Sequence, residues 1–302
     1  MLILGVAASL TAAVAWAISA AFYKTGAKEV PALASNLIRI LAPLFLLMIG
    51  ALMLNLYSQI LLLSPWELLL IFGSSIFAFV VGDALYFVTI QNIGVSRGVP
   101  ITATYPLFTL LLQILFLAQP VHFLMVPAAI ITVTGIALLG RQLDISAQTE
   151  ENISRRQMWI GICAALATAF AWSISIIFLS TVLQTTNLVL VAVIRLTIAL
   201  AILSPLVLGQ QLIKRGLPLT RRKLVYLSIG GISALTIGYV AFAFALQIID
   251  TTSVALLSSL TPLFAAIISW RTLQESFDVK TLIAIIACII GVFLTTIAVA
   301  LV

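Results

Sequence analysis

Three ionisable side chains interrupt stretches that are otherwise apolar: Arg39, Asp83 and Arg195. An ionised group in hydrocarbon is costly unless it is paired, hydrated or able to reach an interface. Arg39 lies roughly 9 Å from one end of its stretch, at 1.5 Å per residue of helix, and Asp83 lies at about the same depth. We therefore expect these two residues to form a structural ion pair. An alternative is that Asp83 is a proton site, because burial favours the neutral carboxyl group.

Arg195 has no acidic residue at the position that would correspond to Asp83. It follows Arg39 by 156 residues, and the residue 156 positions after Asp83 is the neutral Tyr239. A planar guanidinium group binds carboxylate and phosphate groups through two hydrogen bonds. We therefore expect Arg195 to bind an anionic group of a substrate. The alternative for both arginines is that each snorkels to the nearest interface.

Two prolines indicate a candidate binding site. Pro106 and Pro262 lie midway along apolar stretches, and each removes a backbone hydrogen bond and kinks its helix. Helices interrupted at matching positions of two inverted halves point to a substrate site near the middle of the membrane. Hydroxyl groups crowd the same stretches: Thr102, Thr104, Tyr105, Thr252, Ser253, Ser258, Ser259 and Thr261. The alternative is ordinary helix packing, in which small polar residues are common.

These residues belong to a repeat with a constant spacing of 156 residues. The tripeptide Pro106-Leu107-Phe108 returns as Pro262-Leu263-Phe264, and the arginines return within Ile38-Arg39 and Ile194-Arg195. Single residues that return include Trp16 as Trp172, Ser19 as Ser175, Gly82 as Gly238 and Gln91 as Gln247. A repeat of this length indicates a duplicated unit.

The composition predicts a membrane protein. The chain of 302 residues is 63% hydrophobic and 8% charged, which is more apolar surface than a soluble domain can bury. A span needs about 20 apolar residues, and ten stretches qualify: 2–23, 33–55, 66–90, 97–118, 120–140, 158–180, 187–209, 224–247, 253–272 and 279–301. Because each repeat has five spans, the second repeat enters the membrane from the opposite side. We predict an all-α polytopic membrane protein with ten transmembrane helices, arranged as two inverted five-helix repeats.

The basic residues predict the orientation. Of the 15 Lys and Arg residues, 13 fall in loops on one side of this arrangement, none falls on the other, and Arg39 and Arg195 are within spans. Lys and Arg resist translocation, so the basic side is expected to be cytoplasmic. Both termini would then lie outside the plasma membrane. A linker, 141–157, would lie inside, between the first repeat, 1–140, and the second, 158–302.

Aromatic residues repeat as well. Trp16 and Trp172 lie deep in the first span of each repeat rather than at an interface, and a buried Trp needs a partner for its N–H group. Tyr86 corresponds to Phe242. Gly82 and Gly238 each lie one turn from these aromatic residues, where a glycine lets a backbone or a ligand approach closely. Core packing is the alternative for all of these residues.

The order of these motifs, in duplicate, resembles the EamA branch of the drug/metabolite transporter (DMT) superfamily over essentially the whole chain. The motifs are a tryptophan in the first span, an arginine in the second within Asn36-Leu37-Ile38-Arg39 and Val193-Ile194-Arg195, Pro-Leu-Phe in the fourth and an Ile-Gly-Val type stretch in the fifth. The resemblance implies a ten-helix fold whose central cavity is formed largely by the first, third and fourth helices of each half. By motif, the cavity residues would be Trp16, Gly82, Tyr86, Pro106, Trp172, Gly238, Phe242 and Pro262. With Asp83, Tyr105, Arg195 and Tyr239, they make the twelve residues that we expect to bind substrate. Bacterial relatives usually keep both termini in the cytoplasm, whereas the basic residues here predict the reverse.

The residues and the resemblance together favour a secondary active transporter, either an exporter or an importer. Its substrate would be a small metabolite such as an amino acid or a related polar or amphipathic compound, moved by alternating access around a midplane cavity. The expected partners are this substrate and membrane lipid, with a proton or another ion as a candidate for coupling, and no nucleic acid. We expect no cofactor, no metal and no catalytic residue, because Asp83 is the only deep acid. A lipid-modifying membrane enzyme is therefore disfavoured, whereas a membrane-embedded sensor or scaffold is an alternative.

Overall fold

Helices form all the regular secondary structure of the residues that the computed structural model describes, which are 1–117, 121–146, 153–213, 218–273 and 279–301. The elements of the first repeat are α1 (Leu2–Gly26), α2 (Ala32–Met53), η1 (Tyr57–Leu62), α3 (Pro65–Ser75), η2 (Ile76–Gly82), α4 (Asp83–Thr102), α5 (Tyr105–Phe116) and α6 (Met125–Ser146). Those of the second are α7 (Arg155–Val182), α8 (Leu188–Ile213), α9 (Arg221–Gly231), η3 (Ile232–Gly238), α10 (Tyr239–Leu246), α11 (Thr251–Ser258), α12 (Thr261–Leu273) and α13 (Val279–Ala300).

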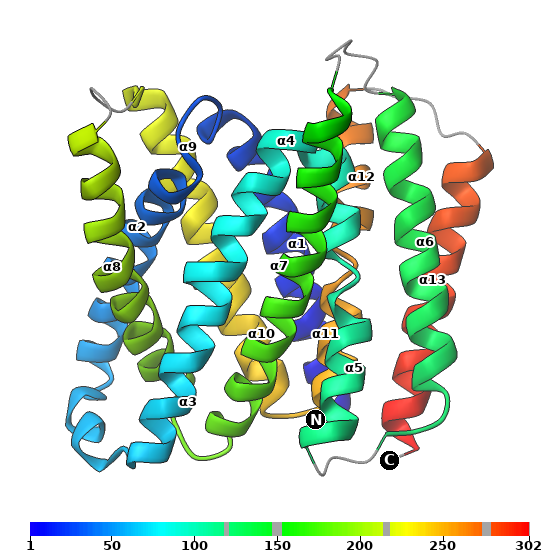
Figure 1. Cartoon of the computed structure of the whole chain (residues 1–302). Helices are drawn as coiled ribbons and strands as arrows, with labels where there is room; N and C mark the ends of the chain where they lie inside the picture. The colour runs from blue at the N-terminus through cyan, green and yellow to red at the C-terminus, as the bar shows by residue number, and fades with distance from the viewer. Residues whose placement is uncertain (118–120, 147–152, 214–217, 274–278, 302) are drawn as a thin grey trace.

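The two repeats run through the bundle in opposite directions. Figure 1 shows α1 leaving the N-terminus at one end of the molecule and α7, its counterpart, starting at the other end; both termini lie at the same end. Eight described segments are long and apolar enough to cross a membrane, and two shorter apolar helices, Met125–Leu138 and Thr251–Ala265, occupy the fifth and ninth positions. The predicted class, ten transmembrane helices in two inverted repeats, is confirmed. Part of the predicted linker, 147–152, lies outside the described residues.

The fourth span of each repeat is broken at the same place. Residues 103–104 separate α4 from α5, and residues 259–260, which follow them by 156 positions, separate α11 from α12. Pro106 and Pro262 are each the second residue of the helix after the break, where a missing N–H group costs nothing because the first turn has no acceptor for it. The expected kinks are therefore complete interruptions, and they lie just before the prolines.

The third span of each repeat contains a π-helix that the sequence did not predict. These π-helices, η2 and η3, are related by the same spacing of 156 residues and end at Gly82 and Gly238. A π-helix shifts the register of the backbone hydrogen bonds and is common at functional sites. Side chains bond to carbonyl groups of these segments: Asn36 Nδ2 donates to the Phe79 carbonyl, and Trp16 Nε1 donates to that of Ala234.

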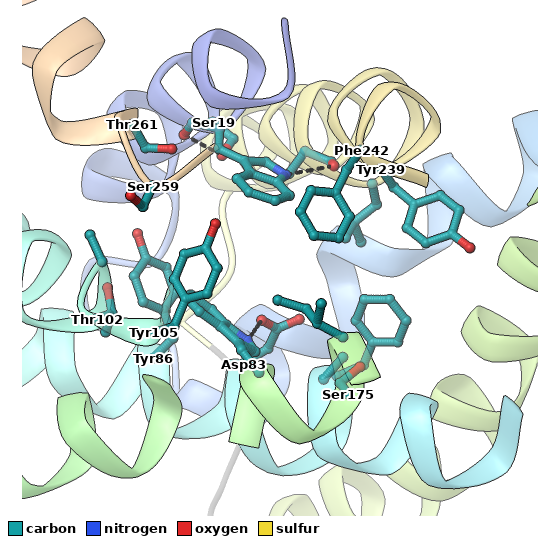
Figure 2. A pocket seen from close by; sticks show the side chains of 18 of the residues that line it. Ser19, Asp83, Tyr86, Thr102, Tyr105, Ser175, Tyr239, Phe242, Ser259 and Thr261 are labelled. Atoms are coloured by element: carbon teal, nitrogen blue, oxygen red, sulfur yellow. Dashed lines mark hydrogen bonds between the residues drawn. The ribbon is translucent and has the colours of Figure 1, made fainter. Parts of the chain in front are cut away.

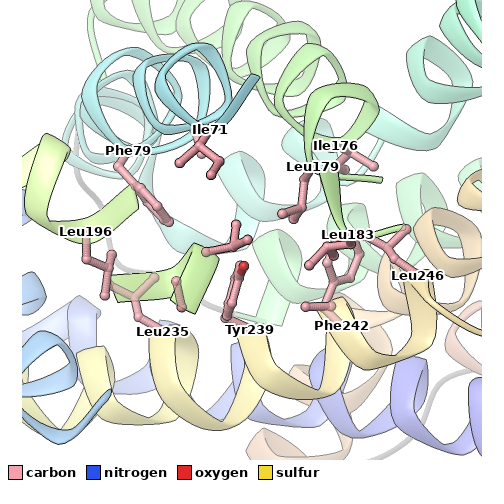
Figure 3. Packing of buried hydrophobic residues seen from close by; sticks show 14 of the residues in the cluster. Ile71, Phe79, Ile176, Leu179, Leu183, Leu196, Leu235, Tyr239, Phe242 and Leu246 are labelled. Atoms are coloured by element: carbon pink, nitrogen blue, oxygen red, sulfur yellow. The ribbon is translucent and has the colours of Figure 1, made fainter. Parts of the chain in front are cut away.

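Two clusters of apolar side chains, related by the repeat, lie on opposite sides of the centre. The terminal-side cluster, on the side of the two termini, contains Ile71, Leu179, Leu183, Phe242 and Leu246, and Figure 3 shows their side chains converging between the helices. The residues 156 positions away form the linker-side cluster: Tyr23, Ala27, Tyr86, Ile90 and Leu227. The bundle is therefore packed above and below its middle by equivalent positions.

Candidate functional site

A cavity of about 160 Å³ lies between the two repeats. Its walls come from the first four spans of both halves. Most of its lining residues form pairs related by 156 positions: Trp16 and Trp172, Ser19 and Ser175, Tyr23 and Leu179, Arg39 and Arg195, Ala78 and Ala234, Phe79 and Leu235, Asp83 and Tyr239, Tyr86 and Phe242, Ala103 and Ser259, and Tyr105 and Thr261. The cavity is therefore symmetric in position; four of these ten pairs are identical residues, and six differ in residue type.

Polar groups lie towards both ends of the cavity. Hydroxyl groups near the breaks of the fourth spans gather at one end, as Figure 2 shows for Thr102, Tyr105, Ser259 and Thr261. Tyr239, Phe242 and Ser175 lie towards the other end. The Tyr105 hydroxyl donates to the Ala255 carbonyl over 2.9 Å and lies 2.7 Å from Ser258 Oγ, so it links the first half to the broken helix of the second.

Arg39 and Asp83 form a buried ion pair between α2 and the start of α4, as the sequence predicts. Each nitrogen of the guanidinium group has a partner, since Nε donates to Asn36 Oδ1 over 3.1 Å, Nη1 donates to the Tyr23 hydroxyl over 3.2 Å and Nη2 donates to Asp83. The other oxygen of Asp83, Oδ1, accepts a bond of 3.1 Å from Trp172 Nε1. The carboxylate therefore connects α2 of the first half, through Arg39, to α7 of the second half, through Trp172.

Arg195 lies in α8 without a carboxylate partner among the described residues. Its Nη2 donates to Ser175 Oγ over 3.0 Å and to the Ser74 carbonyl over 3.4 Å, while Nε is buried without an acceptor. The rings of Phe79 and Tyr239 lie 4.7 and 5.2 Å from the guanidinium carbon. Arg39 and Arg195 are only 4% and 3% exposed, so the alternative that they snorkel to an interface is wrong.

Each repeat-paired tryptophan lies against a glycine of the opposite half. A Cβ atom at Gly82 would lie 2.6 Å from Trp172 Cδ1, and one at Gly238 would lie 2.7 Å from Trp16 Nε1. A side chain at either position would therefore displace an indole ring from the cavity wall. The indoles also contact the paired aromatic residues, with ring centroids 5.5 Å apart for Trp172 and Tyr86 and 5.3 Å apart for Trp16 and Phe242.

The structure brings together eight of the twelve residues expected to bind substrate: Trp16, Asp83, Tyr86, Tyr105, Trp172, Arg195, Tyr239 and Phe242. The other four do not line the cavity. Gly82 and Gly238 contact the indole rings from behind, and Pro106 and Pro262 follow the helix breaks. Sequence reasoning missed Tyr23 and the pair Ser19 and Ser175 as lining residues. The repeat shows that Ser19 and Ser175 correspond, but the sequence does not indicate whether a single hydroxyl group in an apolar helix faces a cavity, a neighbouring helix or lipid.

The two membrane faces carry polar contacts at repeat-related positions outside the cavity. On the linker side, Lys223 Nζ lies 3.0 Å from Glu29 Oε2, and its hydrogen bond lowers the pKa of that carboxyl group. On the terminal side, Thr185 Oγ1 donates to Glu67 Oε1 over 2.6 Å. Thr185 follows Glu29, and Lys223 follows Glu67, by 156 residues. Each contact joins the start of a third span to the turn between the first two spans of the other half.

The described residues offer no group of three His, Cys, Asp or Glu side chains that could hold a metal ion. The acids of the described chain are spread over both faces, and Asp83 alone lines the cavity. The arrangement instead suits recognition of a small solute, because it combines a cation without a carboxylate partner, hydroxyl groups and aromatic faces around one cavity.

Comparison with known proteins agrees with this architecture. The model of the EamA-like transporter family matches the chain twice, over residues 3–141 and 159–297. An uncharacterized transporter of Archaeoglobus fulgidus is 26% identical over 295 residues, which cover 95% of each chain. One solved crystal structure superposes with a TM-score of 0.76 over 98% of this chain and 97% of the other, at 16% identity, and so shows a shared fold. Because the family match covers both repeats, the chain belongs to the EamA-like transporter family of the DMT superfamily.

Proposed function

We propose that the protein is a secondary active transporter that moves a small metabolite across the plasma membrane by alternating access. The observation that carries the proposal is the cavity between the repeats, where both broken fourth spans meet. Broken helices at equivalent positions of inverted repeats expose backbone groups that can bind a solute near the middle of a membrane. Membership of a transporter family supports the same function.

The packing on either side of the cavity supports alternating access. The terminal-side and linker-side clusters are built from equivalent positions, so the same set of contacts can close either face. In inverted-repeat transporters, the two faces open in turn as one half rocks against the other. The terminal-side cluster has Leu183 and Leu179 where the linker-side cluster has Ala27 and Tyr23, so the two closures distribute their bulk differently.

The orientation of the protein is a further part of the proposal. Exposed basic residues at the linker side include Lys24, Lys28, Arg155, Arg156 and Arg221. Because such residues stay in the cytoplasm, we place the linker inside the cell and both termini outside.

Flux into proteoliposomes tests the function. Purified full-length protein would be screened with amino acids, organic acids and cationic drugs, with and without a proton gradient, beside empty liposomes. We expect saturable uptake of at least one solute class, and dependence on the gradient would identify a proton as the coupling ion. Absence of saturable uptake by folded protein across all three classes would contradict the transporter function.

A further inference from the structure

The charged residues that line the cavity leave one positive charge without a partner. Arg39, Asp83 and Arg195 are the only Lys, Arg, His, Asp or Glu residues among the described side chains of the lining. Asp83 contacts Arg39, so these two charges cancel. Asp83 also lies within electrostatic range of Arg195, but one carboxylate cannot neutralise two guanidinium groups, so the described charges of the lining sum to one positive charge.

The surroundings of Arg195 hold its side chain in place without neutralising it. Its acceptors are a hydroxyl group and a backbone carbonyl, and the two rings beside it are uncharged. A buried cation with only neutral partners is unfavourable. Arg39 occupies the equivalent position in the first repeat, and its charge is compensated by a carboxylate, with two further hydrogen-bond acceptors. The missing compensation at Arg195 points to a ligand.

We propose that the cavity binds a small organic monoanion, whose singly charged head group contacts Arg195 and whose apolar body lies against the walls. The inference rests on the proposed function and names the substrate class. One negative charge neutralises the cavity. A zwitterion leaves the net charge unchanged and brings an ammonium group for which no acid is free, because Asp83 is engaged by Arg39 and Trp172. A doubly charged phosphate ester overcompensates the single cation.

The walls fit an apolar body rather than a strongly polar one. Apolar side chains make up much of the lining: Phe79, Ile176, Leu179, Leu235 and Phe242. Trp16 and Trp172 both have their N–H groups engaged, by the Ala234 carbonyl and by Asp83, so they present ring surface to the cavity. Apolar and aromatic walls with one fixed polar anchor are typical of sites for amphipathic small molecules.

Equilibrium binding to the full chain in detergent tests the inference with probes that share one body and differ in charge. The probes are 3-phenylpropionate, phenylalanine, 2-phenylethylamine and 2-phenylethyl phosphate, and a second set is 4-methylpentanoate, leucine and isopentylamine. The variants are Arg195→Gln, Arg195→Lys and, as a matched removal of one positive charge, Arg156→Gln at the exposed start of α7. Folding of each variant is checked by size exclusion and thermal unfolding.

We expect the carboxylates to bind more tightly than their zwitterionic, cationic and phosphorylated partners. Arg195→Gln should weaken that binding about tenfold or more, because hydrogen bonds to charged groups are the strong ones. Arg195→Lys should weaken it less, and Arg156→Gln should leave it unchanged. Tighter binding of the amine, the zwitterion or the phosphate, no binding of either carboxylate, or carboxylate binding that Arg195→Gln leaves intact overturns the inference.

Flux separates this inference from the function on which it rests. Saturable transport of an amine or a zwitterion, equal in wild type and Arg195→Gln, overturns the monoanion assignment and leaves the transporter function standing. Absence of flux for every solute class overturns the function itself.

Discussion

The buried pair between Arg39 and Asp83 gives the sharpest test of the structure, through the change Asp83→Asn. Asparagine keeps the size of the side chain and an oxygen that can accept the hydrogen bond from Trp172 Nε1. The change therefore removes chiefly the negative charge. Arg39, which is 4% exposed, would keep only Asn36 and Tyr23 as hydrogen-bond partners from its present set.

The expected effect is large because one partner of a buried ion pair is removed. Breaking such a pair costs about 3–5 kcal/mol, since the remaining charge is left uncompensated. For a chain of 302 residues, 1 kcal/mol lowers Tm by roughly 1.6 °C, so Asp83→Asn should lower Tm by about 5–8 °C. Arg195→Gln removes a charge that has no carboxylate partner, so the same reasoning predicts an unchanged or raised Tm for the ligand-free protein.

Thermal unfolding of the purified variants in one detergent, followed by circular dichroism, measures both effects. The double variant Arg39→Gln with Asp83→Asn should lose less than the sum of its two single changes, because neither charge is then left alone. The reasoning is refuted if Asp83→Asn unfolds within about 2 °C of wild type, or if Arg195→Gln is the less stable of the two.

Three further predictions concern packing, pH and topology. Gly82→Ala should cost about 1–3 kcal/mol of unfolding free energy and disturb the fluorescence of Trp172, because the new Cβ atom would lie 2.6 Å from its Cδ1 atom; Gly50→Ala, which meets nothing within 4 Å, should be neutral or stabilising. The contact of Lys223 with Glu29 lowers the pKa of the carboxyl group, so any stability it adds is present near neutral pH and is lost as pH falls. The Tm of Lys223→Ala should therefore converge with that of wild type on acidification, and a difference that grows at low pH would refute this role. For topology, a cysteine at the exposed Ser58 should react with an impermeant thiol reagent in intact cells, whereas one at the exposed Thr25 should react only after the membrane is opened; the opposite pattern would show that the termini are inside.

The sequence predicts the architecture well because the constraints of a membrane are simple. Apolar length indicates spans, and a constant spacing of 156 residues indicates that the second half repeats the first. The shared depth of Arg39 and Asp83 was enough to predict their contact, because an isolated charge at that depth needs a partner. The prolines at 106 and 262 located the breaks of the fourth spans to within a few residues.

The finer geometry depends on contacts between halves, which one sequence does not reveal. Neither π-helix was predicted, since Ile76–Gly82 and Ile232–Gly238 have the composition of ordinary apolar helix. Gly82 and Gly238 were expected to admit a ligand or a backbone, but each instead accommodates an indole of the other half. Tyr23 was missed because its role depends on Arg39 of a neighbouring helix, to which its hydroxyl group is bonded.

Accessibility of the cavity from both faces is the most direct test of the proposed mechanism. A single cysteine at Ser259, which lines the cavity beside a helix break, would be placed in a chain whose Cys163 and Cys288 are replaced by alanine. Impermeant thiol reagent would be applied to intact cells and to inside-out vesicles. Alternating access predicts that the cysteine reacts from each side and that a bound substrate slows the reaction. Reaction from only one side, with and without substrate, would contradict it.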